Sequence, residues 1–489
     1  MTNLPNHPVL YEINTWAWLN ELSRQAGRPV TLGSVPDETW DALSAWGFDA
    51  VWLMGVWERS PAGIQIAMQN EGLVAEFQRA LPNFTPEDVA GSPYCIRRYS
   101  VDEQIGGSQG LAAARRALSE RGMGLVLDFV PNHVAPDHPW VNEHPEYFVL
   151  GDAGDLRRAP AEFIQVGESV IARGRDPYFA PWQDVVQLNA FDPGLRKAII
   201  ATLTDIAGQC DGVRCDMAML FLNDIFSQTW GNRLGARPAA EYWTEVIGAV
   251  KAIQPGFIFM AEAYWDKEWE LQQLGFDYCY DKRLYDRLAH ESAQAVQGHL
   301  RASLDYQARL VRFIENHDEP RAAATFSPEK QRAAALTVAT QMGLRLFHEG
   351  QLEGRRVKLP VFLARRPDEP VDTALQDFYR NLLGGLRLEA LHTGEWRLCD
   401  CSGWPDNPSF QNLVAWSWRE ANGFALIVVN LSDAQSQGQV RLPWGELAGR
   451  LWQLTDRLTD QSFERGGNEL LDPGLFVDLP PWGFHFFTT

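Results

Sequence analysis

Cysteine and long apolar runs are both scarce in this chain. Six cysteines in 489 residues are too few for a disulfide scaffold. The one close pair, Cys399 and Cys401, lacks the CxxC spacing of a zinc or redox site, so we expect reduced and buried thiols. No apolar stretch approaches the roughly 18 residues that a membrane-spanning helix needs, so no such helix is predicted.

Positive charge is also in deficit. The chain has 43 Lys and Arg against 63 Asp and Glu, which gives a net charge of −20 at pH 7. A nucleic acid or an anionic membrane needs a basic face to bind, so neither is expected as a partner. The first residues, MTNLPNHPVLYEINTW, lack a basic segment followed by an apolar one. We therefore predict no signal peptide and expect a cytoplasmic location.

Apolar and aromatic residues, by contrast, are plentiful. The 45% hydrophobic content and 19 Trp suffice for a large core, and the length predicts one large domain with one or two smaller ones. Amphipathic patterns predict helices over 108–124, 191–210 and 239–255, the second capped by Asp192 with Pro193 in its first turn. Eight short apolar runs are typical of strands, at 9–16, 47–57, 125–130, 211–216, 256–265, 276–281, 308–318 and 343–350.

This alternation of strands and helices predicts an α/β fold with a parallel sheet, and eight units predict a closed (β/α)8 TIM barrel. The competing architecture is an open, doubly wound sheet. Its glycine-rich first turn is missing here, since no GxGxxG follows an early strand, and this favours the barrel. We expect the barrel at 1–133 and 191–390, an inserted domain at 134–190 after the third strand, and a C-terminal all-β sandwich domain at 391–489.

Four of the predicted strands end in polar clusters. These are DFVPNH (128–133), GVRCD (212–216), MAEAYW (260–265) and FIENHDE (313–319). In a (β/α)8 barrel such ends converge at one mouth, where the loops build the active site, so Asp216, Glu262 and Asp318 would face one cavity. A single carboxylate of this kind is more often a solvated loop residue. Four clusters at equivalent strand ends favour a shared site.

Taken in order, DFVPNH, GVRCDMAM, MAEAYW and FIENHDE resemble the α-amylase family of retaining α-glycoside hydrolases and transglycosidases. The resemblance covers roughly residues 9 to 390, and SPYCIRRY (92–99) and VVQLN (185–189) are weaker matches. It implies that Asp216 attacks the anomeric carbon to form a covalent glycosyl-enzyme and that Glu262 is the acid/base. Asp318 is the implied third carboxylate, which stabilises the transition state.

The resemblance also implies substrate-binding residues. Tyr94 would stack beneath the sugar ring, and His133 and His317 would hydrogen-bond its hydroxyls. Arg214 lies two residues before Asp216, and side chains two apart on a strand point to the same side. We therefore expect its guanidinium beside the nucleophile, where it keeps the carboxylate ionised; a purely structural ion pair is the alternative.

Several positions bear on the substrate and on metals. Many family members carry Lys-His where this chain has Met219 and Leu220, so the acceptor side must be built differently. Asn132 matches a residue that often ligates calcium, and the sequence leaves a structural calcium open; no cofactor is predicted.

The segments 136–148 and 174–189 loosely resemble the family branch that moves maltosyl units. The arginine-rich segment 347–367 either binds a phosphate or forms salt bridges.

The sequence thus predicts a retaining α-glycoside hydrolase that acts on α-glucans or α-glucosides. The first alternative is a transglycosidase, either a maltosyl or glucosyl transferase or a sucrose-active enzyme. The second is a non-catalytic carbohydrate-binding barrel, against which the intact trio of carboxylates argues. Linkage, chain length, endo or exo action and oligomeric state are left open by the sequence.

Overall fold

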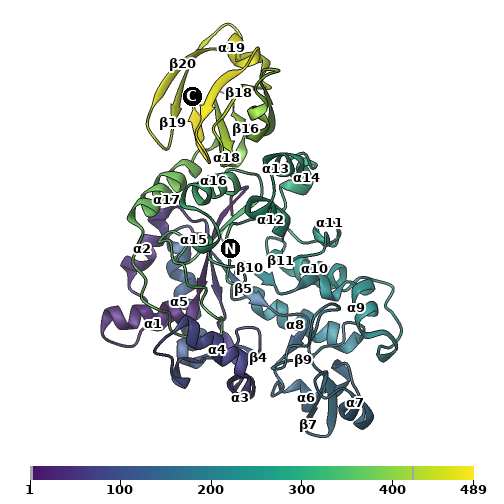
Figure 1. Cartoon of the computed structure of the whole chain (residues 1–489). Coiled ribbons are helices and arrows are strands. Elements are labelled where there is room, and N and C mark those ends of the chain that lie inside the picture. Colours follow the sequence, from purple (N-terminus) through teal and green to yellow (C-terminus); the bar gives the residue numbers. More distant parts are fainter. Residues whose placement is uncertain (1–3, 421–422) are drawn as a thin grey trace.

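The computed structural model describes residues 4–420 and 423–489, and its largest part is a closed barrel of eight parallel strands (Figure 1). The strands run around the barrel in the order β1-β14-β13-β12-β11-β10-β5-β2. Almost every residue of these strands is buried, because one face fills the barrel and the other meets the surrounding helices. The predicted (β/α)8 barrel is confirmed, and each of the eight predicted runs overlaps one of its strands. These strands are β1 (Val9–Asn14), β2 (Ala50–Met54), β5 (Gly124–Phe129), β10 (Gly212–Cys215), β11 (Ile258–Ala261), β12 (Tyr278–Tyr280), β13 (Leu310–Arg312) and β14 (Leu344–His348).

Helices cover the outside of the barrel (Figure 1). The longer ones are α1 (Thr15–Ala26), α2 (Asp37–Trp46), α5 (Gly107–Glu120), α8 (Pro193–Ala207), α10 (Tyr242–Ile253), α12 (Lys282–His290), α16 (Pro328–Ala339) and α17 (Thr373–Leu386). The start of α8 is as predicted, since Asp192 Oδ1 accepts the backbone N–H of Leu195 at 2.8 Å. Pro193 occupies the first turn, where a missing N–H costs little.

Two excursions leave the barrel before the next helix begins. In the predicted insertion, β6 (His133–Val134) pairs with β9 (Val186–Gln187), and β7 (Phe163–Val166) forms a hairpin with β8 (Ser169–Ala172). The other excursion, between β2 and α5, was not predicted. It contains β3 (Trp57–Arg59), α3 (Pro61–Gln69), α4 (Glu71–Ala80) and β4 (Ile96–Val101). Its two helices are nine and ten residues long, so each carries too short a periodic pattern to recognise.

The C-terminal region is an antiparallel sheet domain that sits at one end of the barrel (Figure 1). The strand order is β20-β19-β22-β17-β16-β15-β18-β21. The predicted all-β C-terminal domain is therefore confirmed, whereas the residue boundaries of all three domains stay predictions. Residues 1–3 and 421–422, which fall within the predicted domains, lie outside the described residues. The strands are β15 (Glu395–Ser402), β16 (Leu413–Glu420), β17 (Gly423–Asn430), β18 (Ser436–Arg441), β19 (Leu451–Asp456), β20 (Ser462–Gly466), β21 (Leu475–Leu479) and β22 (Phe484–Thr488).

This domain shares a hydrophobic core with the barrel. Trp416 and Trp418 of β16 are fully buried, and both indoles donate to the Thr340 carbonyl at the end of α16, at 3.2 and 2.8 Å. Both belong to the same apolar cluster as the barrel strands. The two domains are therefore expected to stabilise each other.

Trp418→Ala is expected to lower the free energy of unfolding by about 3 to 5 kcal/mol, because it leaves a cavity between the two domains. Trp404→Ala is the matched control, since that indole lies in the same domain and is 39% exposed. It should cost less than about 1 kcal/mol. Denaturant unfolding followed by circular dichroism measures both, and equal costs would contradict a stabilising interface.

The structure shows free cysteine thiols and places the arginine-rich segment in ion pairs. All six thiols are free, and five of them are buried, as predicted. Arg365 pairs with Asp88 at 2.6 Å and Arg366 with Glu349 at 2.5 Å, in line with the salt-bridge interpretation. Within the described part of the chain, no helix has the length and apolarity to cross a bilayer.

Candidate active site

The ends of three barrel strands bring the predicted carboxylates to one cavity. Asp216 directly follows β10, Glu262 directly follows β11, and Asp318 lies in the loop after β13. All three line a cavity of about 340 Å³. Its other lining residues are Ser92, Tyr94, His133, Trp182, Asp184, Val185, Met217, Tyr264 and Phe362. The mouth of the barrel thus collects acidic, aromatic and imidazole side chains from segments far apart in the sequence.

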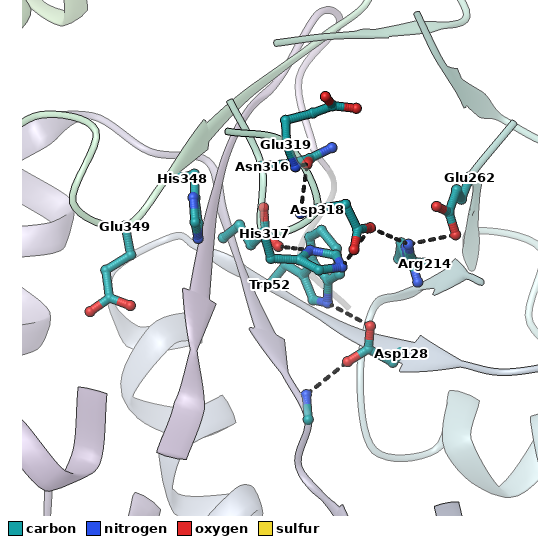
Figure 2. Close-up of polar contacts among 12 residues, drawn as sticks. Trp52, Asp128, Arg214, Glu262, Asn316, His317, Asp318, Glu319, His348 and Glu349 are labelled. Carbon is teal, nitrogen blue, oxygen red and sulfur yellow. Dashed lines mark hydrogen bonds and ion pairs between the residues drawn. The ribbon is translucent and has the colours of Figure 1, made fainter. Parts of the chain in front are cut away.

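Arg214 holds the three carboxylates together. Its fully buried guanidinium donates from Nη1 to Asp216 Oδ1 and from Nη2 to Glu262 Oε2, each at 2.7 Å. Asp318 Oδ2 lies 3.8 Å from the same Nη2, and Figure 2 shows Arg214 between Asp318 and Glu262. Burial disfavours the cation, but Glu262 and the other acidic groups outweigh it and raise the pKa of Arg214 well above its usual value. The guanidinium therefore stays charged and keeps Asp216 oriented.

Glu262 has the surroundings of a group that holds a proton. Its side chain is almost fully buried, and burial raises its pKa to about 7 against the opposing pull of Arg214. Glu262 Oε1 accepts the Tyr264 hydroxyl at 2.8 Å, and Oε2 accepts the Met217 N–H at 2.7 Å. A carboxyl group with such a pKa can start a reaction at neutral pH as a general acid.

His317 connects Asp318 to the first barrel strand (Figure 2). Its Nε2 lies 2.9 Å from Asp318 Oδ2, and its Nδ1 contacts the buried carboxylate of Glu12 on β1. Burial disfavours the imidazolium, but Asp318 and Glu12 outweigh it and raise the pKa of His317 to about 10. The protonated ring in turn holds the pKa of Asp318 below its usual range, although burial opposes this. Asp318 is thus an anion, and its side chain is 42% exposed to an incoming ligand.

The other predicted binding residues lie around this group. The Tyr94 ring stacks on His317 with centroids 5.5 Å apart, and its hydroxyl lies 2.6 Å from His317 Nε2. His133 is buried beside Trp182, with ring centroids 5.2 Å apart. The structure therefore brings all seven predicted site residues together. Five of these residues line the cavity. Arg214 and His317 do not line it but contact its carboxylates. Their roles stay predictions.

Several site residues were missed at the sequence level. Glu12 sits inside the fully buried run VLYEIN, and a carboxylate there needs a partner, so it could have been flagged. Asp128 accepts from Trp52 Nε1 at 3.2 Å and from Gly55 N at 2.8 Å, and burial raises its pKa to about 6 (Figure 2). It fixes the indole that lies over Arg214. Trp182 comes from a loop, whose path the sequence does not indicate.

The surroundings of Asn132 do not fit a calcium ion. Gln187 Nε2 donates to Asn132 Oδ1 at 2.9 Å, and Asn132 Nδ2 donates to Gln187 Oε1 at 3.2 Å. The amide oxygen that would ligate the ion is therefore already paired. Among the described residues, no group of three or more His, Cys, Asp or Glu is placed to hold a metal.

Comparisons with known proteins find relatives named as α-amylases and maltosyltransferases. No family model matches the chain. It is 25% identical over 344 residues to "Alpha-amylase MalA" of Haloarcula japonica, a match that covers 67% of this chain and 45% of that protein. It is 29% identical over 260 residues to "Alpha-1,4-glucan:maltose-1-phosphate maltosyltransferase" of Rhodospirillum rubrum, covering 51% and 31%. The chain thus spans less than half the length of either curated relative.

Solved structures share the fold over the whole chain. A maltogenic α-amylase, AmyB of Thermotoga neapolitana, superposes with a TM-score of 0.71 at 19% identity, with 99% of both chains covered. A debranching enzyme of Nostoc punctiforme gives a TM-score of 0.67 at 16% identity, with 100% of both chains covered. At these identities the likeness shows the shared architecture of barrel and C-terminal sheet domain.

Proposed function

We propose, on the premise of the α-amylase-family assignment that these comparisons support, that this chain is a retaining α-glycoside hydrolase acting on α-glucans or α-glucosides. The observation that carries the proposal is the shared cavity of Asp216, Glu262 and Asp318. Arg214, which hydrogen-bonds to two of them, keeps the pair close, and closely spaced carboxyl groups favour the retaining geometry.

In this mechanism the two carboxyl groups that Arg214 bridges have different roles, one as nucleophile and one as acid/base. Asp216, oriented by its hydrogen bond from the guanidinium, attacks the anomeric carbon while Glu262 gives its proton to the departing oxygen. Asp318 accepts hydrogen bonds from the sugar hydroxyls and stabilises the developing positive charge. Water then attacks the glycosyl-enzyme, and Glu262, now ionised, takes the proton from it.

A transglycosidase is the second candidate, and the maltosyltransferases among the relatives favour it. Incubation with maltooligosaccharides, and separately with sucrose, followed by proton NMR distinguishes the candidates. Retention predicts that α-anomeric products appear first, as hydrolysis products or as longer saccharides. First-formed β-anomers would contradict the retaining mechanism. Saccharide binding without turnover would support a non-catalytic barrel.

The value of kcat/KM is expected to fall as pH rises through about 7. Glu262 must be protonated to act as the acid, and burial raises its pKa to about 7, so the active form is lost above that pH. Tyr264→Phe removes a hydrogen bond that favours the ionised carboxylate, and this should move the alkaline limb to higher pH. A pH–rate profile measures both effects.

Tyr306→Phe is the control for this profile, because Tyr306 packs on Trp269 and neither residue lines the catalytic cavity. Its alkaline limb should coincide with that of the unmodified chain. An alkaline limb near 4.5, the ordinary value for a glutamic acid, would contradict the raised pKa of Glu262 on which this prediction depends.

A further inference from the structure

Glu12 is a buried carboxylate of the barrel wall that the proposed mechanism does not use. It lies in β1 with no exposed surface, and its Oε1 contacts Nδ1 of His317. Its other oxygen, Oε2, has no hydrogen-bond partner in the part of the chain that the structure describes. A carboxylate that has left water needs a partner to offset its lost hydration. His317 is therefore the group that compensates the charge of Glu12.

The two ring nitrogens of His317 face two different carboxyl groups. Nδ1 contacts Glu12, and Nε2 lies 2.9 Å from Asp318 Oδ2. An ionised carboxylate only accepts hydrogen bonds, and an imidazole donates from both nitrogens only in its cationic form. The geometry therefore favours a ring with a proton on each nitrogen. The pKa of His317 agrees: burial lowers it, but Asp318 and Glu12 outweigh burial and raise it to about 10.

The Tyr94 hydroxyl provides the alternative arrangement. It lies 2.6 Å from the same Nε2 and could donate to that nitrogen if the ring were neutral. In that case the nitrogen lone pair and Asp318 Oδ2, 2.9 Å apart, would repel each other. With a cationic ring, in contrast, the Nε2 proton meets two acceptors, the phenol oxygen and the carboxylate.

Two aromatic rings hold the imidazole in this orientation. The Tyr94 ring stacks on it with centroids 5.5 Å apart, and Trp52 of β2 meets it edge to face, also at 5.5 Å. Trp52 is fixed in turn, because its Nε1 donates to Asp128 at 3.2 Å (Figure 2). A ring that is packed by two neighbours and bonded at both nitrogens is held against rotation. Asp318 is thereby tied to the barrel wall through His317 and Glu12.

The other charged groups near His317 have partners of their own. Asp128 of β5 accepts from Trp52 and Gly55, and Arg214 of β10 contacts Asp318 from the side opposite His317 (Figure 2). His317 also lines a hollow of about 10 Å³, and the other titratable or charged side chains around it are Glu319, Arg321, His348, Glu349, Lys358 and Arg366. The three cations among them contact neighbouring carboxylates or a carbonyl. Glu12 and Asp318 are therefore the charges that set the protonation of the ring.

We propose that Glu12 is a positioning residue for the sugar-binding carboxylate: it keeps His317 doubly protonated and so holds Asp318 as an anion in a fixed orientation. The inference rests on the proposed function of the catalytic cavity. Glu12 acts only through His317, and its effect reaches the sugar through Asp318, whose side chain is 42% exposed and lines the cavity.

Loss of the charge on Glu12 has a defined consequence. Glu12→Gln preserves the shape of the side chain, and its amide oxygen can still accept a proton from Nδ1. The neutral ring that this favours has a lone pair on Nε2, which faces Asp318 Oδ2. The repelled carboxylate then leaves the orientation in which it binds the sugar hydroxyls.

NMR titration of isotope-labelled histidine nitrogens tests the protonation directly and needs no turnover. The His317 signal is assigned by its loss in His317→Asn. In the unmodified chain we expect an imidazolium at neutral pH, with a midpoint near the pKa of about 10. In Glu12→Gln the midpoint should fall by about 1 to 3 pH units, because one of the two facing charges is gone. Glu12→Asp keeps the charge and should restore part of this shift.

The kinetic effect of Glu12→Gln is expected to depend on pH. Below its new midpoint the variant still has a cationic ring, so its kcat/KM should approach that of the unmodified chain. Above it, the ratio of the unmodified kcat/KM to that of the variant should grow about tenfold per pH unit, until His317 of the unmodified chain titrates as well. The alkaline limb that Glu262 causes is common to both proteins and cancels in this ratio.

Glu21→Gln is the matched control, since Glu21 lies on α1 and pairs with Arg355 at 3.3 Å. It should change neither the His317 midpoint nor the kinetic ratio. A neutral His317 at pH 7 in the unmodified chain, an unchanged midpoint in Glu12→Gln, or a ratio that does not vary with pH would overturn the positioning role. A high midpoint that falls in Glu12→Gln, without turnover of any α-glucoside, would instead overturn the proposed function alone.

Discussion

Asp216→Asn is expected to lower kcat on an α-linked oligosaccharide by a factor on the order of 10⁴ or more. The carboxamide has the shape of the carboxylate but is a far weaker nucleophile, so the covalent glycosyl-enzyme cannot form at a useful rate. The amide oxygen can still accept from Arg214, so the fold should persist. Steady-state kinetics measure the loss, and circular dichroism checks the fold.

Asp224→Asn is the matched control for this variant. Asp224 lies on α9 (Asn223–Trp230), its side chain is 75% exposed, and it pairs with Arg237 at the surface. The same chemical change there should leave kcat within twofold of the unmodified chain. Undiminished activity of Asp216→Asn would remove Asp216 as the nucleophile, whatever the result for Asp224.

The second large effect is expected for Arg214→Met, which should lower the free energy of unfolding by about 3 to 5 kcal/mol. The change leaves Asp216 and Glu262 buried side by side without the cation that bridges them. The two carboxyl groups then repel each other, and Asp216 loses the hydrogen bond that orients it. We expect kcat/KM to fall by at least about 100-fold. Denaturant unfolding and steady-state kinetics measure the two effects.

Arg121→Met provides the comparison, since Arg121 also contacts two carboxylates but does so at the surface. Its guanidinium lies 2.7 Å from Asp41 and 3.2 Å from Asp37, whose side chains are 65% and 82% exposed. Exposed ion pairs of this kind contribute about 0 to 1 kcal/mol. A similar stability loss in both variants would contradict the special position of Arg214 beneath the cavity.

The barrel and the core of the site follow from short-range features of the sequence. Strand lengths, helix caps such as Asp192 and polar clusters at strand ends repeat often enough to predict eight units and one mouth. The spacing of Arg214 and Asp216 predicts their contact, because side chains two apart on a strand share a face. Glu12 was not predicted as a site residue, because it lies in the middle of a buried strand and not in a polar cluster at a strand end.

The acceptor side could not be predicted, because it depends on how loops fold. Met219 and Leu220, where many family members have Lys-His, are buried in the core and do not line the catalytic cavity. Tyr178 and Trp265, whose ring centroids lie 4.9 Å apart, come from separate loops whose approach is a tertiary contact. Loop paths of this kind have no periodic pattern in the sequence.

The most direct test of the account is mass spectrometry after reaction with a fluorinated α-glucosyl fluoride, which slows hydrolysis of a covalent intermediate. The account predicts one added glycosyl unit per chain, located on the peptide that contains Asp216 and absent from Asp216→Asn. Attachment to a different residue, or turnover of α-glucosides to β-anomers with no label on Asp216, would contradict it.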